Sequence, residues 1–275
     1  MLNLIASEVK QAPFPHIVSD RILEESLFNA LRADYPDASI FEGQKGVSGM
    51  SGSRTGQGFD IYRGDEAYSA LMAKSEAWRE FDAYINSRTF VEKFVELFGD
   101  RLADTGCSVE ISPDKYERDY IEPRHVMTAH ETLKSKILDL GRHILPKKAR
   151  KPVPLFSRLD IHKALTGYAK QVHCDRPNRL CSLIIYFTDA DEAGIVGGDL
   201  TIHQHKVDKP FTEYERHPKP EDAPVIAKLR PKKNRGVFFP CCNNSYHGVT
   251  AVETQGKERD YLYINISGHG DSIWY

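Results

Sequence analysis

The chain lacks a long uninterrupted apolar stretch. No part of its 275 residues approaches the ~18 to 20 apolar residues that a membrane-spanning helix needs, so we expect no membrane partner. The N-terminal MLNLIASEVKQAPFPH has no basic stretch followed by a long apolar one, which predicts no secretory signal. An excess of one charge is also missing, because 37 Lys and Arg nearly balance 39 Asp and Glu. The net charge of -2 gives no global field that would favour nucleic acid.

Cysteine is scarce and irregularly placed. The five cysteines are an odd number, and their spacing fits neither a disulfide framework nor a CxxC zinc pattern. We interpret the adjacent Cys241 and Cys242 as small residues of a tight loop, with a zinc or redox role as the alternative. Unpaired thiols predict a reducing, cytoplasmic setting.

The first half of the chain has the apolar spacing of helices. It also contains a stretch, 41–60, that is rich in Gly and Ser and has no apolar period, so we expect a loop there. Gly99 is expected to end the helix that precedes it. The predicted helices are 22–31, 67–81, 87–98 and 127–145.

After Pro154 the pattern changes to short alternating stretches. About eight strand candidates follow, separated by Gly, Pro, Asn and Asp. Evenly spaced short strands predict a sandwich or barrel, including the double-sheet jelly roll, or double-stranded β-helix. We therefore expect a mostly β, α+β fold with flanking helices. In this prediction 1–275 is one domain, in which helices and loops of 1–154 brace a jelly-roll core of 155–275.

A histidine and an aspartate two residues apart precede an apolar strand candidate in VHCDRPNRLCSLIIYFT. Such a pair also arises by chance, as His269-Gly270-Asp271 shows. A facial triad binds a metal through two histidines and one carboxylate and leaves the opposite positions open. Only four residues follow the second pair, which leaves no strand for a third ligand. After His173 and Asp175, by contrast, His247 begins a later strand candidate.

Arg259 stands at the entry to the last strand candidate, in KERDYLYINI. An arginine there can hold a carboxylate through two parallel, charge-assisted hydrogen bonds. The alternative is an ordinary strand-end cation that faces solvent.

Residues beside these motifs are assigned to packing or to solvent. Cys174 lies between two candidate ligands, so on a strand its side chain points away from them, and we expect it to pack. His203 and His205 share one face of a strand candidate. We expect this pair to face solvent, with the lining of a substrate entrance as the alternative.

The order of these motifs resembles the Fe(II)- and 2-oxoglutarate-dependent dioxygenases, in particular their prolyl-hydroxylase-like branch. The resemblance covers the part of the chain after Pro154. In chain order it is carried by Gly167-Tyr168, His173-Cys174-Asp175, SLIIYFT, Gly197-Gly198-Asp199-Leu200, RGVFFP, His247-Gly248-Val249 and Arg259.

The resemblance implies roles for single residues. His173, Asp175 and His247 would bind Fe(II), and Arg259 would pair with the distal carboxylate of 2-oxoglutarate. Tyr186 and Tyr168 would line the co-substrate site, with packing in the core as the alternative for both. The implied chemistry is activation of O2 with conversion of 2-oxoglutarate to succinate and CO2, and ascorbate could stimulate it. Related halogenases have a small residue in place of the carboxylate, so Asp175 favours hydroxylation.

We expect the substrate to be a small or carrier-attached metabolite, such as an amino acid or a natural-product intermediate. The chain has no recognition domain, and its loops at 41–60, 104–126 and 206–224 could close over a compact ligand. One alternative is a protein hydroxylase that acts on a prolyl or other side chain. Another is a catalytically inactive jelly-roll binding module. The sequence predicts no oligomeric state.

Overall fold

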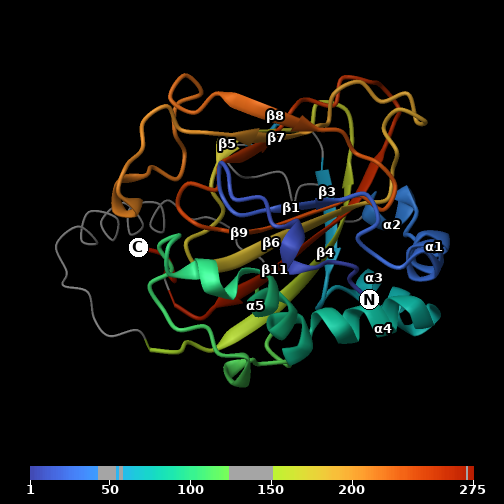
Figure 1. The fold of residues 1–275 in the computed structure, drawn as a ribbon. Coiled ribbons are helices and arrows are strands. Elements are labelled where there is room, and N and C mark those ends of the chain that lie inside the picture. The colour runs from blue at the N-terminus through green and yellow to red at the C-terminus, as the bar shows by residue number, and fades with distance from the viewer. Residues whose placement is uncertain (43–53, 56–57, 124–150, 271) are drawn as a thin grey trace.

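Two antiparallel β-sheets form the centre of the structure (Figure 1). A computed structural model describes residues 1–42, 54–55, 58–123, 151–270 and 272–275. The larger sheet has the order β1 (Ile17–Ser19), β9 (Gly236–Pro240), β6 (Arg179–Tyr186), β11 (Arg259–Gly268), β4 (Leu155–Ala164) and β3 (Gly58–Tyr62). The smaller sheet has the order β2 (Arg54–Thr55), β5 (Ala169–His173), β10 (His247–Val249), β7 (Leu200–His203) and β8 (Val225–Leu229).

From β4 onward the chain passes back and forth between the two sheets, except that β7 and β8 follow each other in the smaller one. β4, β6, β9 and β11 lie in the larger sheet, and β5, β7, β8 and β10 lie in the smaller one. All eight pair with antiparallel neighbours. This order agrees with the predicted double-sheet core after Pro154, and it confirms the mostly β, α+β class.

The larger sheet has one apolar face and one polar face. Directly paired residues of neighbouring strands share a face. Phe238, Leu183 and Ile264 are therefore on one face, and they are fully buried. Tyr263 and its neighbour across the ladder, Asp160, are on the other face, which is turned toward the smaller sheet. Side chains of β11 thus point alternately into the apolar core on one face and into the space between the two sheets on the other.

Helices cover the apolar face of the larger sheet (Figure 1). α5 places three phenylalanines against Phe238 of β9, with ring centroids 5.4 to 6.1 Å apart. The Ser87 side chain caps this helix by accepting a hydrogen bond from the backbone N–H of Phe90. The helices are α1 (Glu25–Ala33), α2 (Ala38–Glu42), α3 (Glu66–Lys74), α4 (Glu76–Ile85) and α5 (Arg88–Leu102), with single 3-10 turns at Ala6–Glu8, Pro113–Lys115 and Phe211–Glu213.

Two helix predictions need correction. The stretch 67–81 belongs to two helices, because Ser75 leaves the helical conformation and caps α4 through the backbone N–H of Trp78. The helix predicted to end at Gly99 continues to Leu102. Gly106, at a φ of +88°, follows the end of this helix, where the backbone N–H of Cys107 bonds the carbonyl of Leu102. The helix predicted over 127–145 lies outside the described residues.

The predicted loop over 41–60 contains strands. β3 begins at Gly58 and pairs with β4 from Gly58–Ala164 to Tyr62–Asp160. Its GFDIY is a short alternating run, and its Gly- and Ser-rich surroundings concealed it in the sequence. The half of the chain before residue 155 thus supplies β1, β2 and β3 as well as helices.

Two further findings concern the state of the cysteines and the apolar character of the helices. All five cysteines are free and buried, so no disulfide framework exists. None of the helices that the structure describes has the length and apolar character needed to cross a membrane.

Candidate metal centre

His173 and His247 face each other across the pair of strands β5 and β10. His173 ends β5, His247 begins β10, and the two are direct partners in the antiparallel register. Both side chains are buried, and their ring centroids are 4.4 Å apart. Each ring donates a hydrogen bond from Nδ1, to the carbonyl of Gln171 (2.8 Å) or of Ser245 (2.9 Å). These bonds fix the tautomer that leaves the Nε2 lone pair available to a metal.

Asp175 completes a group of three possible ligands. Its carboxylate oxygens lie 3.8 Å from Nε2 of His173 and 3.7 Å from Nε2 of His247. The three ligand atoms lie within 4.8 Å of one another, and Nε2 of His173 is buried with no hydrogen-bond partner among the described residues. A carboxylate oxygen and an imidazole nitrogen that are 3.7 to 3.8 Å apart can both lie ~2 Å from one ion. The donor set of two imidazoles and one carboxylate therefore fits a divalent metal.

The electrostatics keep all three groups in the form that binds metal. Burial lowers the pKa of His173 well below 6.5 and also lowers the pKa of His247. Burial acts to raise the pKa of Asp175, but the positive charges of His247, when protonated, and of Arg179 hold it well below 3.8. Neutral imidazoles and an ionised carboxylate at neutral pH are the ligand forms that bind a cation without first losing a proton.

A hydroxyl group from the other sheet supports Asp175. Ser182 on β6 donates its Oγ hydrogen bond to Oδ2 of Asp175 at 2.6 Å, and Ser182 Oγ lies 2.9 Å from Oη of Tyr263 on β11. Sequence reasoning missed both residues. The signal that was available is the period of two in β11, which places Tyr263 on the face of Arg259.

Cys174 is turned away from the three ligands, as predicted. It packs with Val172, Ala223 and Tyr246 in a small cluster apart from the main core. Its Sγ lies 3.1 Å from the carbonyl oxygen of Asn243.

Arg259 is buried inside the structure instead of facing solvent. Only 1% of the residue is exposed, and its guanidinium carbon lies 4.7 Å from the ring centre of Tyr261, 5.3 Å from Tyr168 and 5.8 Å from Tyr186. Its Nη1 donates to the carbonyl of Gly198, while its Nε has no hydrogen-bond partner. Among the described residues no carboxylate forms an ion pair with it, so this buried cation is left without an anionic partner.

Of the three tyrosines around Arg259, Tyr186 and Tyr168 differ in their hydrogen bonds. Burial raises the pKa of Tyr186 to about 12, so its hydroxyl stays protonated and can donate to an anion. No hydrogen bond joins this hydroxyl to another described residue. Tyr168 accepts a hydrogen bond from the hydroxyl of Tyr261 at 3.0 Å.

The Gly197-Gly198 turn holds the carbonyl that contacts Arg259. Both residues have a positive φ, of +75° and +73°, which favours glycine. A side chain at Gly197 would place Cβ 1.8 Å from the carbonyl oxygen of Ala251. The turn therefore requires glycine for space as well as for conformation.

The expectation that His203 faces solvent is wrong. His203 is buried, and its two ring nitrogens lie 2.8 Å from the carbonyl oxygen of Ala223 and from Oγ1 of Thr201. Both ring nitrogens are thereby used within the fold. His205 is only partly exposed and hydrogen bonds the carbonyl of Val207.

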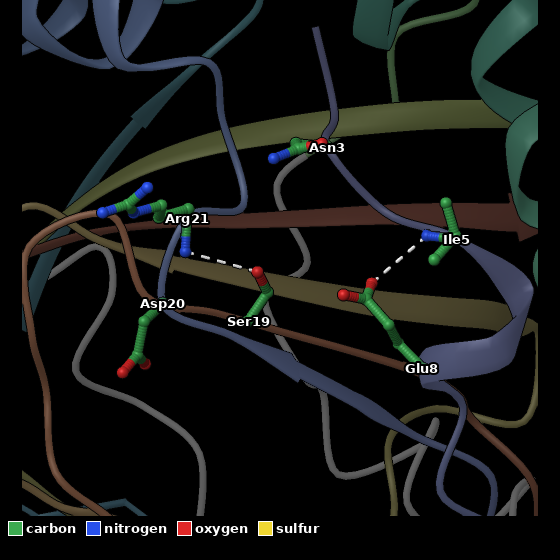
Figure 2. A pocket seen from close by; sticks show the side chains of 6 residues that line it. All are labelled: Asn3, Ile5, Glu8, Ser19, Asp20 and Arg21. Carbon is green, nitrogen blue, oxygen red and sulfur yellow. Dashed lines mark hydrogen bonds between the residues drawn. The ribbon is translucent and has the colours of Figure 1, made fainter.

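A surface hollow of about 370 Å³ lies away from these residues (Figure 2). Figure 2 shows the hydrogen bonds from the backbone N–H of Ile5 to Glu8 and from that of Arg21 to Ser19. None of the predicted site residues lines it, and its polar groups lie on the surface. The buried triad, and not this hollow, is therefore the candidate site.

Comparisons with known proteins give one family match and several remote structural likenesses. Residues 159–266 match the family model of the 2OG-Fe(II) oxygenase superfamily. A prolyl 4-hydroxylase from Pseudomonas putida is 13% identical, with 93% of each chain covered and a TM-score of 0.47. A prolyl hydroxylase from Trichoplax adhaerens, solved with a peptide of hypoxia inducible factor, is 11% identical, with 92% of this chain and 83% of that chain covered and a TM-score of 0.41. No curated protein matches the chain.

The matched range contains every residue that the geometry assigns to the site. It includes the three ligands, Ser182 and Arg259, and it runs from β4 to near the end of β11. Residues 159–266, which carry the candidate site, are thus similar to the 2OG-Fe(II) oxygenase superfamily, whose enzymes use Fe(II), 2-oxoglutarate and O2.

Proposed function

We propose that this oxygenase binds Fe(II) through His173, Asp175 and His247 and hydroxylates a small or carrier-attached metabolite. The observation that carries the proposal is the triad itself. Two imidazole Nε2 atoms and one carboxylate converge, and backbone carbonyls hold each imidazole in the tautomer that a metal needs. A catalytically inactive binding module would not need these features together.

The co-substrate is proposed to bind between the triad and Arg259. The buried guanidinium would hold the distal carboxylate of 2-oxoglutarate, and the protonated hydroxyl of Tyr186 would donate a hydrogen bond to it. Tyr168 would form part of the same wall, because its ring lies against the guanidinium of Arg259. When bound, Fe(II) and 2-oxoglutarate supply the activation of O2, with release of succinate and CO2.

The protein itself positions the metal ligand Asp175 and excludes water from the guanidinium of Arg259. Ser182 orients Asp175, and the aromatic rings around Arg259 remove water from the guanidinium, which strengthens its attraction for a carboxylate. Asp175 occupies the carboxylate position of the triad, which supports hydroxylation over halogenation.

Two of the loops predicted to close over a ligand contact the site, which supports a compact substrate. Arg216 of the loop 206–224 donates its Nε hydrogen bond to the carbonyl of Cys174, between two of the ligands. Glu122 of the loop 104–126 contacts Arg176, the residue after Asp175. A protein hydroxylase needs an open groove at this place instead. We also propose a cytoplasmic setting, which the five free thiols support.

The test is turnover of 2-oxoglutarate by the purified chain. With Fe(II), ascorbate and 2-oxoglutarate, the wild type is expected to form succinate, even slowly and without substrate. Asp175→Ala should abolish it, because the triad loses its charged ligand. His269→Ala is the matched control, since His269 belongs to the other His-x-Asp sequence and pairs with Glu117. Equal succinate formation by the wild type and Asp175→Ala would contradict the proposal.

Metabolites and peptides can then be compared in the same assay. A compact metabolite should increase succinate formation and gain one oxygen atom, which mass spectrometry detects. Stimulation by prolyl peptides alone would favour the protein hydroxylase.

A further inference from the structure

Four arginine side chains gather beside the metal triad. They come from β4, from the turn after Asp175, from the start of β6 and from the segment between β7 and β8. They are Arg158, Arg176, Arg179 and Arg216. Mutual repulsion acts on the cluster, because Arg176 and Arg216 each feel the positive charge of Arg179.

Two of the four arginines are neutralised by carboxylates. Arg158 contacts Asp160 (2.6 Å), Glu122 (3.3 Å) and Asp60 (3.7 Å) through its three nitrogens. Arg176 lies 3.6 Å from the second oxygen of Glu122. These three carboxylates form their ion pairs with Arg158 and Arg176, while Glu122 and Asp160 attract Arg179 from farther away.

The other two arginines have no such partner. Arg179 is only 9% exposed, donates to the hydroxyl of Tyr263 and leaves its buried Nε without a hydrogen bond. Arg216 donates its Nε hydrogen bond to the carbonyl of Cys174 at 3.1 Å. Among the described residues, neither guanidinium is ion-paired with a carboxylate.

Both unpaired cations are connected to the metal ligands. The backbone N–H of Cys174 bonds the carbonyl of Arg216, so this arginine lies against the segment that carries His173 and Asp175. Arg179 reaches Asp175 through the hydroxyl groups of Tyr263 and Ser182. A group held by these arginines would therefore lie next to the metal.

Counted over the described residues, the charge balance of the cluster lacks one anion. Four guanidinium groups meet three carboxylates, and Asp175 belongs to the metal. Buried charges without partners are costly. Arginine is the side chain best suited to bind a planar carboxylate in two-point contact.

We propose that Arg179 and Arg216 bind a carboxylate of the substrate, so that the substrate is a compact organic acid. This inference rests on the proposed oxygenase function, and it names the substrate class. The carboxylate would supply the missing negative charge, and its fixed position would present the rest of the molecule to the metal.

The experiment measures carboxylate binding without turnover. In metal-free protein with EDTA, the melting temperature is followed as sodium acetate or sodium benzoate replaces sodium chloride at constant ionic strength. The wild type should show a saturable rise. The double variant Arg179→Gln/Arg216→Gln should lose at least tenfold in apparent affinity. Every chain measured also carries Arg259→Gln, because this other buried guanidinium would itself bind a carboxylate, and Arg88→Gln on α5, which breaks an exposed ion pair with Glu92, is the control that should retain the rise.

Two results would overturn the proposal: no saturable rise in the wild type, or the same rise in the double variant. A merely structural role would lower the melting temperature in chloride and leave the carboxylate dependence unchanged. If the double variant does not fold, Arg216→Gln alone serves, since its Nε bond is to a backbone carbonyl. Because the measurement needs neither metal nor turnover, its failure leaves the oxygenase proposal standing. Conversely, a chain that makes no succinate can still show the rise.

Discussion

Ser182 of the larger sheet hydrogen bonds Asp175 beside the smaller sheet, with 2.6 Å between Ser182 Oγ and Asp175 Oδ2. The Asp175 carboxylate is thereby held by a residue of the sheet opposite to β5, the strand that precedes it. We expect Ser182→Ala to lower metal affinity about 10- to 100-fold, as the loss of a partner that orients a ligand generally does. Titration with Fe(II) or Co(II) under anaerobic conditions measures it. Ser267→Ala is the control, because Ser267 is equally buried but bonds Asn265. Equal affinity in both variants would contradict this role.

Replacing Arg259 should separate co-substrate binding from metal binding. Arg259→Gln loses a buried charge that would bond a carboxylate, a contribution of about 1.5–3 kcal/mol. The KM for 2-oxoglutarate should rise correspondingly, by roughly 10- to 150-fold, while Co(II) affinity stays near that of the wild type. Tyr186→Phe should raise the same KM by a smaller factor, because it removes one neutral donor. An unchanged KM in Arg259→Gln would remove the arginine from the co-substrate site.

His16 should make stability depend on pH. It is buried and hydrogen bonds the carbonyl of Phe14, and burial, with a contribution from Lys10, lowers its pKa below 6.5. The unfolded chain takes up a proton near pH 6.5 that the folded chain takes up only at lower pH. The free energy of unfolding therefore falls as pH decreases through 6.5, by at most ~1.4 kcal/mol per pH unit. In urea unfolding at pH 7.5 and 5.5, His16→Gln should lose less stability than the wild type. An equal loss would show that His16 does not contribute.

We propose that residues 1–275 fold as one domain. Phe238 of β9 is fully buried beneath Phe90, Phe94 and Phe98 of α5, so Phe238→Ala should cost about 3–5 kcal/mol.

The two tryptophans of the chain provide the measurement. Trp78 lies in α4, and Trp274 donates a hydrogen bond to the carbonyl of Arg179 at the start of β6. In Trp78→Phe and Trp274→Phe backgrounds, fluorescence reports one tryptophan at a time. Phe238→Ala should shift both transitions together, whereas a shift of only one would refute the single domain.

The sequence indicated where the candidate residues lie relative to the strands. His173 ends β5, His247 begins β10 and Arg259 begins β11, and such places are visible as changes in the sequence pattern. The facial triad also has a fixed stoichiometry, which made His247 the natural third ligand.

The contacts between non-consecutive strands were not predictable in the same way. Ser182 and Tyr263 meet because β6 and β11 are neighbours in the sheet, although 81 positions separate the two residues. Burial of His203 depends on the carbonyl of Ala223, in the segment that leads into β8. Hydrogen bonds of this kind depend on the order of the strands within a sheet. The hydrophobic periodicity of the sequence does not reveal that order.

The direct pairing of His173 with His247 has a consequence for folding fidelity. A slip of one residue between β5 and β10 would turn one imidazole to the opposite face of the sheet. An ion that binds both rings is therefore compatible only with the native alignment. During refolding the metal would favour the native register of β5 and β10. It would stabilise chains whose smaller sheet is assembled correctly and would not stabilise misaligned chains.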